Sequence, residues 1–326
     1  MTTPPVFSAS ASANADLPLA VGPAMSATAC IFEESFVFIA TLIATDGSLA
    51  PEISDRARLA LADAGCAPVV GRWIDEGYAL DIAFAGDPAA ARAVLEPMAD
   101  VVVQPEAGRA KKLLVADMDS TMITIECIDE LADYAGIKAE IAEVTERAMR
   151  GELDFEAALD ARVALLKDLD AGAIDRCHAE RVVLMSGART LIQTMKAHGA
   201  RSVLVSGGFT VFADRVAADI GFDRALSNTL GIHGGKLTGT VARPIVGAAT
   251  KRETLIAEAE ALGIDLSETL AVGDGANDIP MIQAAGLGVA YHAKPKTAAA
   301  AGARIDRGDL TALLYAQGYA RKDWVA

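Results

Sequence analysis

LLVADMDST, residues 113–121, decides how this chain folds, because a short apolar strand runs directly into two carboxylates and two hydroxyls. Asp117 and Asp119 lie one residue apart where that strand ends. A lone aspartate in this place is usually a turn residue or a helix cap. Two like charges that leave water together are unfavourable unless a cation or a proton neutralises one of them. The pair therefore indicates a site with a chemical purpose.

Further polar clusters follow in order along the chain. Ser206 and Gly207 come directly after the apolar run at 202–205, Lys251 follows, and GDGAND at 273–278 comes after the apolar run at 269–272. From Lys111 onward, strand-like and helix-like runs alternate, which predicts an α/β fold with a parallel sheet covered by helices on both faces. Ligands of such sheets bind at the carboxyl ends of the strands, so we expect these clusters to form one site.

A long helical stretch separates the strand at 113–116 from the strand that ends at Ser206. Apolar residues keep helical spacing there, for example Phe155, Leu159 and Val163. A plain crossover needs only one helix, so the extra helices at about 127–185 predict an inserted cap over the strand ends. The glycine-rich segment 230–240 predicts a small hairpin that contacts this cap.

The first third of the chain has a different pattern. Strands are expected at 36–44, 67–73, 78–84 and 101–104, with helices at 51–64 and 87–98, and this βαββαβ order is typical of a ferredoxin-like α+β sandwich. Residues 1–30 are rich in Ala, Ser, Thr and Pro without periodicity, which predicts a flexible tail. We therefore expect a tail at 1–30, a first domain at 31–108 and a second domain at 109–326.

The ordered motifs resemble those of a known family. Asp117 with Asp119, then Ser206, then Lys251, then Asp274 with Asp278 are similar to the four motifs of the haloacid-dehalogenase-type phosphohydrolases, and their wording resembles the phosphoserine phosphatases within that superfamily. The resemblance covers about 110–320 and implies a Rossmann-like parallel sheet with a helical cap. The unit at 31–108 is similar in element order to ACT domains, which sense small molecules. As a sensor, the unit would bind serine. The alternative is a packing or dimerisation module that binds no ligand.

The resemblance implies roles for the acidic residues. Asp117 would be the nucleophile that forms an aspartyl-phosphate, and Asp119 would donate and accept the proton. Mg²⁺ would be held by the Asp117 carboxylate, the backbone carbonyl of Asp119 and Asp274, since hard oxygen ligands beside a phosphate select this ion. Asp278 would orient the metal waters or Lys251. Its alternative role is to stabilise the N-terminus of the helix that begins near Asn277.

Lys251 has an independent local argument. Thr250 and Glu253 have capping-box spacing, which predicts that Lys251 lies at the start of a helix. A cation at this positive end costs about 0.5 kcal/mol unless an anion sits there. The residues expected to bind the phosphate are Ser206, the backbone N–H of Gly207, Lys251 and Asn277.

The cap is expected to choose the substrate. Arg162 falls on the same helical face as Phe155 and Leu159, so a guanidinium lies on an apolar stripe, where it is disfavoured unless it is paired. Its planar fork matches a substrate carboxylate, and Glu126 would accept the substrate ammonium. Met149 and Phe155 match the family's apolar cap contacts. The alternative for Arg162 is an internal salt bridge to Glu146 or Asp160.

Together these residues predict Mg²⁺-dependent hydrolysis of O-phospho-L-serine to serine and phosphate, which in the family is the last step of serine biosynthesis. The alternatives are a phosphatase for another small phosphomonoester, such as phosphohomoserine or phosphoethanolamine, and a phospho-acceptor signalling domain. Asp278 stands where the third glycine of a dinucleotide-binding motif belongs, which argues against a nicotinamide enzyme.

Composition limits the partners. The 326 residues carry a net charge of −15, which disfavours nucleic acids and anionic membranes. Four separated cysteines suggest no disulfide framework, and no lysine or arginine precedes Arg56, so a signal peptide is not indicated. We expect a cytoplasmic protein that acts on a small molecule, with a homodimer as a possible assembly.

Overall fold

The computed structural model of the chain describes residues 38–150 and 152–325, with the exception of the side chain of Met149. The tail expected at 1–30 and the first residues of the strand expected at 36–44 lie outside the described residues. Within the described part, no helix combines the length and the apolar character needed to cross a membrane.

One mixed sheet contains most of the strands, in the order β2-β4-β1-β5-β13-β12-β11-β6-β7-β8. From β13 to β8 every neighbouring pair is parallel. This part consists of β13 (Ala303–Ile305), β12 (Leu287–Tyr291), β11 (Thr269–Gly273), β6 (Leu113–Ala116), β7 (Arg201–Phe209) and β8 (Arg224–Asn228). The α/β fold with a parallel sheet, predicted from the alternation after Lys111, is confirmed, as is the Rossmann-like form that the family resemblance implies.

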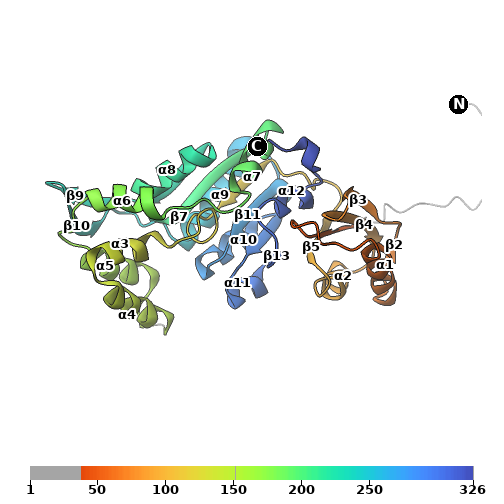
Figure 1. Ribbon diagram of the computed structural model, residues 1–326, viewed down its shortest axis with the longest axis horizontal. Coiled ribbons are helices and arrows are strands. Elements are labelled where there is room, and N and C mark those ends of the chain that lie inside the picture. The colour runs from red at the N-terminus through yellow and green to blue at the C-terminus, as the bar shows by residue number, and fades with distance from the viewer. Residues whose placement is uncertain (1–37, 151, 326) are drawn as a thin grey trace, which may run out of the picture. The chain divides into compact units, whose positions relative to one another are not determined.

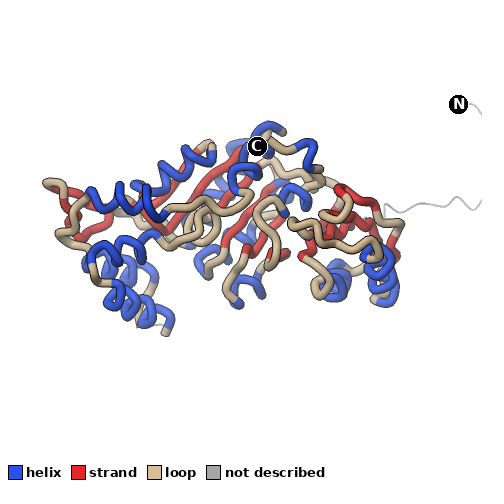
Figure 2. The backbone as a smooth tube through the Cα atoms, viewed as in Figure 1, coloured by secondary structure: helices blue, strands red, loops and turns tan. Residues whose placement is uncertain are grey.

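Both faces of the parallel part are covered by helices (Figure 2). Side chains of a strand alternate between the faces, so Leu114 and Ala116 of β6 belong to one apolar cluster and Leu113 and Val115 to another. The first cluster includes α7 (Ala188–Ala197), α8 (Thr210–Ile220) and α12 (Ala312–Ala316), and the second includes α9 (Ala248–Leu262) and α10 (Ile279–Ala284). Burial on both faces explains why these strands are apolar throughout.

Between β6 and β7 the described residues form α7, which covers the sheet, and four further helices before it, namely α3 (Cys127–Ala135), α4 (Lys138–Met149), α5 (Phe155–Leu165) and α6 (Gly172–Arg181). The predicted hairpin is confirmed as β9 (Leu230–His233) and β10 (Lys236–Val241), and it packs beside α5 (Figure 1). The backbone N–H of Asp168 donates to the carbonyl of Leu237 at 2.9 Å, and the N–H of Leu237 donates to Leu169 at 2.9 Å. The hairpin thus contacts the inserted helices, as expected.

The N-terminal unit contains β1 (Phe38–Ile43), α1 (Ile53–Asp63), β2 (Ala67–Pro68), β3 (Arg72–Asp75), β4 (Ala79–Ala85), α2 (Pro88–Leu95) and β5 (Asp100–Pro105). Its strand order is β2-β4-β1-β5 with antiparallel neighbours, and β3 also pairs with β4. The single strand expected at 67–73 is wrong, because β2 and β3 are separate. Pro68 still pairs with Phe84, and the N–H of Val69 donates to the carbonyl of Ala83 at 2.8 Å, so the pairing with β4 is interrupted only after Val69.

The remaining elements are short: α11 (Pro295–Ala300) and the 3₁₀ turns η1 (Leu266–Glu268), η2 (Ala276–Asp278) and η3 (Arg321–Asp323). Both η2 and α11 follow parallel strands of the sheet, β11 and β12 respectively. They therefore lie at the edge of the sheet where the predicted motifs are expected to meet.

Candidate active site

Neighbouring strand ends bring the predicted motifs together. β6 lies between β11 and β7, with Ala116 level with Val272 on one side and with Leu204 on the other. Asp117 therefore lies beside the end of β11, which leads to Asp274, and beside the second half of β7, which contains Ser206. Ser120 has a φ of 56°, a left-handed conformation that turns the chain sharply away from the end of β6.

Lys251 lies at the centre of a buried charge network. Its Nζ is 2.6 Å from Oδ1 of Asp117 and 2.6 Å from Oδ1 of Asp278. Asp278 also accepts a hydrogen bond from the N–H of Gly275 at 2.9 Å, so it contacts both the lysine and the start of η2. Burial favours a neutral Lys251, yet the two carboxylates raise its pKa and keep it charged. Lys251 thus meets its anions within the protein.

The predicted capping box around Lys251 is wrong. α9 begins at Ala248 with Gly247 as its N-cap, and Thr250 donates its hydroxyl to the carbonyl of Ile245 at 3.5 Å instead. The spacing alone could not reveal that the helix starts earlier. Lys251 still lies near the N-terminal end of α9, as expected.

A second carboxylate group completes an acidic cluster. Asp117, Asp274 and Asp278 each offer an oxygen, and these oxygens lie within 4.8 Å of one another. Thr121 donates its hydroxyl to Asp274 at 3.2 Å. Burial and the charge of Asp278 raise the pKa of Asp274 to about 6. Burial and Asp278 also raise the pKa of Asp117 well above its usual range, against the effect of Lys251. The cluster is thus suited to a cation with hard oxygen ligands.

Asp119 differs from its neighbour Asp117. Its Oδ1 is buried without a hydrogen-bond partner among the described residues. Burial, followed by the charge of Glu126, raises the pKa of Asp119 to about 7, and hydrogen bonding to Cys127 acts in the opposite direction. Ser120 donates its hydroxyl to Glu126 at 2.8 Å. A carboxyl group with a pKa near neutrality is suited to both donating and accepting a proton.

Ser206 and Gly207 lie within β7, past the residues that pair with β6, and hydrogen bonds hold this part of the strand. The Ser206 hydroxyl accepts the N–H of Gly208 at 2.8 Å. Asn228 donates to the carbonyl of Gly207 at 2.9 Å and accepts the N–H of Val246 at 2.7 Å. Sequence reasoning missed Asn228, which ends β8 and could have been found by the strand-end rule. A Cβ on Gly207 would lie 3.2 Å from the ring of Phe155, so this glycine permits the aromatic ring to approach.

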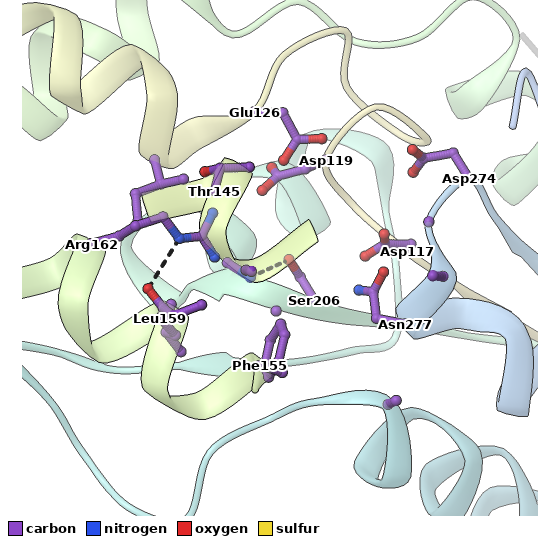
Figure 3. Close-up of a pocket in the computed structure, with 18 of the residues that line it drawn as sticks. Asp117, Asp119, Glu126, Thr145, Phe155, Leu159, Arg162, Ser206, Asp274 and Asn277 are labelled. Atoms are coloured by element: carbon purple, nitrogen blue, oxygen red, sulfur yellow. Dashed lines mark hydrogen bonds between the residues drawn. The ribbon is translucent and has the colours of Figure 1, made fainter. Parts of the chain in front are cut away.

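Arg162 reaches the same space from α5. Figure 3 shows its guanidinium directed toward the centre of the pocket, with Asp117 and Asn277 on the far side of Ser206. Its Nε donates to the carbonyl of Ala158 at 3.3 Å. In residues 38–150 and 152–325 it forms no ion pair, whereas the alternative partners Glu146 and Asp160 pair with Arg150 and Arg243. Burial lowers the pKa of Arg162, and nearby acids oppose that effect.

A cavity of about 690 Å³ contains these groups. Among the predicted residues, its wall includes Asp117, Asp119, Glu126, Phe155, Arg162, Ser206, Gly207, Asp274 and Asn277. Lys251 and Asp278 lie behind the wall, and Met149 ends α4 with a side chain outside the described part. Wall residues that the prediction missed include Thr145, Leu153, Lys294, Lys296 and Thr297. Lys294 and Lys296 follow β12, so the strand-end rule could have found them.

Comparisons with known proteins agree with this geometry. The model of the haloacid dehalogenase-like hydrolase family matches residues 114–283. A phosphoserine phosphatase of Streptomyces coelicolor is 50% identical over 215 residues, which are 66% of this chain and 52% of that protein. The chain thus spans about half the length of this curated relative.

Solved structures are similar as well. A probable phosphoserine phosphatase from Vibrio cholerae has a TM-score of 0.71 and 36% identity, covering 88% of each chain. A phospho-aspartyl intermediate analogue of phosphoserine phosphatase has a TM-score of 0.59 and 40% identity, covering 63% of this chain and 98% of the other. The family match spans more than half of the 326 residues and includes the predicted motifs from Asp117 to Asp278. The chain therefore belongs to the haloacid dehalogenase-like hydrolase family.

Proposed function

We propose that this protein is a phosphoserine phosphatase, which hydrolyses O-phospho-L-serine to L-serine and phosphate as the last step of serine biosynthesis. The observation that carries the proposal is the unpaired guanidinium of Arg162, which faces a site built for phosphoryl transfer across one cavity. A phosphoester with a carboxylate at its other end fits between them. The similarity to phosphoserine phosphatases supports the same substrate.

Asp117 is the proposed nucleophile. Lys251 binds one of its oxygens at 2.6 Å, which orients the carboxylate and acts to lower its pKa, against burial and Asp278, which raise it. Attack of a carboxylate oxygen on phosphorus forms an aspartyl-phosphate and breaks the bond to the serine oxygen. Ser206, the N–H of Gly207, Lys251 and Asn277 would hold the phosphate oxygens.

Asp119 is the proposed acid and base. With a pKa of about 7, part of the Asp119 population is protonated at neutral pH and can give its proton to the departing serine oxygen. The resulting carboxylate can then take a proton from the water that hydrolyses the aspartyl-phosphate. The orphaned Oδ1 leaves one oxygen of Asp119 available for these transfers.

The donor set fits Mg²⁺. Three carboxylate oxygens within 4.8 Å of one another repel unless a cation lies near them, and small hard cations prefer such oxygens. Asp117, the backbone carbonyl of Asp119 and Asp274 would hold the ion, and Asp278 would support Lys251. When bound, Mg²⁺ offsets the negative charge of the phosphate as Asp117 approaches it.

Substrate recognition is assigned to the inserted helices and to Glu126. Arg162 would bind the substrate carboxylate with both arms of its fork, and Glu126 would accept the ammonium. Phe155, which packs against Gly207, and Met149 would enclose the apolar part of serine.

We infer a domain layout of a tail at 1–30, a domain at 31–108 and a catalytic domain at 109–326 with a cap at about 127–185. The antiparallel order β2-β4-β1-β5 with α1 and α2 supports a ferredoxin-like, ACT-like first domain. Titration of the full Arg162→Ala chain with serine tests a sensor role, because product binding at the catalytic site is weakened there. Lack of saturable heat would leave a structural or dimerising role. A cytoplasmic homodimer is part of the same proposal.

Phosphate release from a panel of substrates, with Mg²⁺ and with EDTA, tests the function. We expect phosphoserine to be turned over fastest, phosphoethanolamine to be slow because it lacks the carboxylate, and all turnover to stop in EDTA. Equal rates for phosphoserine and phosphoethanolamine would rule out carboxylate recognition. A higher kcat/KM for phosphohomoserine than for phosphoserine would show that the substrate is different while the proposed chemistry still holds.

A further inference from the structure

Two lysines on the cavity wall have no role in the chemistry proposed above. Lys294 directly precedes α11, and Lys296 lies within it, on the segment that follows β12. Both are exposed, and neither forms an ion pair with any carboxylate of the described residues. A cation that lines a cavity without an acidic partner is available to an anionic ligand.

The same wall has a second unexplained group. Thr297 is fully buried, lines the cavity, and its hydroxyl has no hydrogen-bond partner in the described part of the chain. Buried hydroxyl groups are nearly always paired, so an orphaned one beside two free cations indicates that a polar ligand comes to this wall.

The charges of the protein oppose the entry of an anionic substrate. The chain carries a net charge of −15, and four acidic residues line the cavity. Lys251 is fully buried and bound to both Asp117 and Asp278, so these two carboxylates offset its charge. The cations that line the cavity in the described residues are Arg162, Lys294 and Lys296. A phosphate dianion approaching the entrance therefore meets mostly negative charge unless local cations guide it.

The two kinds of cation stand on different walls. Arg162 comes from α5, while Lys294 and Lys296 come from the sheet side, where the backbone N–H of Lys294 donates to the carbonyl of Asp274 at 3.2 Å. The lysines thus adjoin the acidic cluster at which the phosphate is expected to bind. Cations on both sides of the cavity would select the orientation in which phosphate faces the sheet and carboxylate faces the cap.

We propose that Lys294 and Lys296 form a capture site for the phosphate dianion of the incoming substrate, which raises the association rate and sets the entering orientation. The inference rests on the proposed function in that its ligand is a phosphomonoester. The lysines act before the chemical step, so they contribute to kcat/KM and not to kcat. Their contribution is electrostatic and weakens as salt screens it.

The test compares a Lys294→Gln/Lys296→Gln variant with the wild type and with Lys322→Glu, which lowers the net charge by the same two units. Lys322 is an exposed lysine in η3 outside the cavity wall, so its change controls for net charge. At low ionic strength we expect kcat/KM of the double variant to fall about tenfold with kcat unchanged, and the gap to close at high ionic strength. Equal kcat/KM at low salt, or a fall in kcat, would overturn the proposal.

Two further measurements distinguish the capture site from an effect on Mg²⁺ binding and from an error in the proposed substrate. The Mg²⁺ concentration at half-maximal turnover should be the same in both proteins; if saturating Mg²⁺ restores the variant, the lysines act through Asp274 and the capture site is wrong. Each comparison is made with phosphoserine and with p-nitrophenyl phosphate, which has no carboxylate. If the wild type hydrolyses p-nitrophenyl phosphate but not phosphoserine, the proposed substrate is wrong. The capture site is then still tested by the fall of kcat/KM for p-nitrophenyl phosphate in the double variant. If neither is hydrolysed, affinity for inorganic phosphate at low salt decides it.

Discussion

The two walls of the cavity are built on different principles. On the sheet side, Asp117 and Asp278 contact Lys251 directly, and hydrogen-bonded strands fix the backbone on both sides of β6. On the helical side, Arg162 presents a guanidinium with no acidic partner among the described side chains. The central cation of the sheet wall thus has its anions within the protein, whereas the cation of the helical wall has none. This difference agrees with the proposal that the chemistry takes place at the sheet and that the inserted helices recognise the substrate.

Asp117→Asn tests the sheet wall most severely. The amide keeps the shape of the side chain but is a poor nucleophile, so we expect kcat to fall by at least about 10⁴-fold. Steady-state phosphate release measures this loss. An acid-labile phosphoenzyme, trapped from the wild type by rapid quenching, should be absent from the variant.

Wild-type turnover in Asp117→Asn would contradict the nucleophile assignment. Ser206 is the matched control, since it lines the same wall. Ser206→Ala removes one proposed phosphate donor and leaves the nucleophile, so the phosphoenzyme should still form in that variant, at a lower rate.

Lys251→Met tests whether the sheet wall is held together by charge. The change leaves Asp117 and Asp278 buried without their cation, and we expect it to lower the free energy of unfolding by about 3–5 kcal/mol at neutral pH. Loss of Lys251 raises the pKa of Asp117 further, because the lysine now acts to lower it. Chemical denaturation followed by circular dichroism measures the effect.

The stability of Lys251→Met at different pH values tests how Lys251 acts on Asp117. A carboxyl group whose pKa is higher in the folded state than in the unfolded state costs stability above its unfolded pKa. That cost shrinks as the pH falls toward the unfolded pKa, so the gap between variant and wild type should narrow from neutral to acidic pH. Lys322→Met, at an exposed site, should show no gap. A gap that widens in acid would exclude this explanation.

The sheet wall was largely predictable from the sequence, for a physical reason. Side chains at parallel strand ends must meet at one edge of the sheet, so the positions of Asp117, Ser206 and Asp274 follow from the strands alone. The start of α9 was not predictable from Thr250, because the helix begins at Ala248 after an extended Gly247 that has no side chain to mark the cap. Helix capping is a weak signal that packing readily outweighs.

Arg162→Ala tests the helical wall. If the guanidinium binds the substrate carboxylate, its loss should lower kcat/KM for phosphoserine by about 10²-fold, in line with charged hydrogen bonds of about 1.5–3 kcal/mol. Turnover of p-nitrophenyl phosphate should change little, since that ester has no carboxylate. Parallel losses on both substrates would show that Arg162 supports the fold or the chemistry instead.

The helical wall was less predictable because partner choice depends on distance, which sequence spacing does not give. Glu146 and Asp160 were reasonable partners for Arg162, and both pair elsewhere. The break between β2 and β3 was equally hard to predict, since the pairing with β4 continues past Pro68 and stops only after Val69. Lys294 and Lys296 were within reach of the strand-end rule.

Asp160→Asn is the mildest change to the helical wall. Asp160 of α5 pairs with Arg243, which follows β10, and both side chains are about half exposed. Exposed ion pairs contribute about 0.2–1 kcal/mol, so we expect a loss of stability below about 1 kcal/mol. Buried apolar contacts among Leu159, Val163 and Leu237 should keep α5 beside the hairpin.

Thermal unfolding and kcat/KM for phosphoserine test this expectation together. Leu237→Ala is the contrasting change, since loss of a buried leucine costs about 2–5 kcal/mol. If Asp160→Asn lowers kcat/KM as strongly as Arg162→Ala, the ion pair positions α5 for recognition, and the helical wall depends on charge as much as the sheet wall does. A small effect would mean that packing alone positions α5, and that Arg162 is the charged group of this wall that the substrate requires.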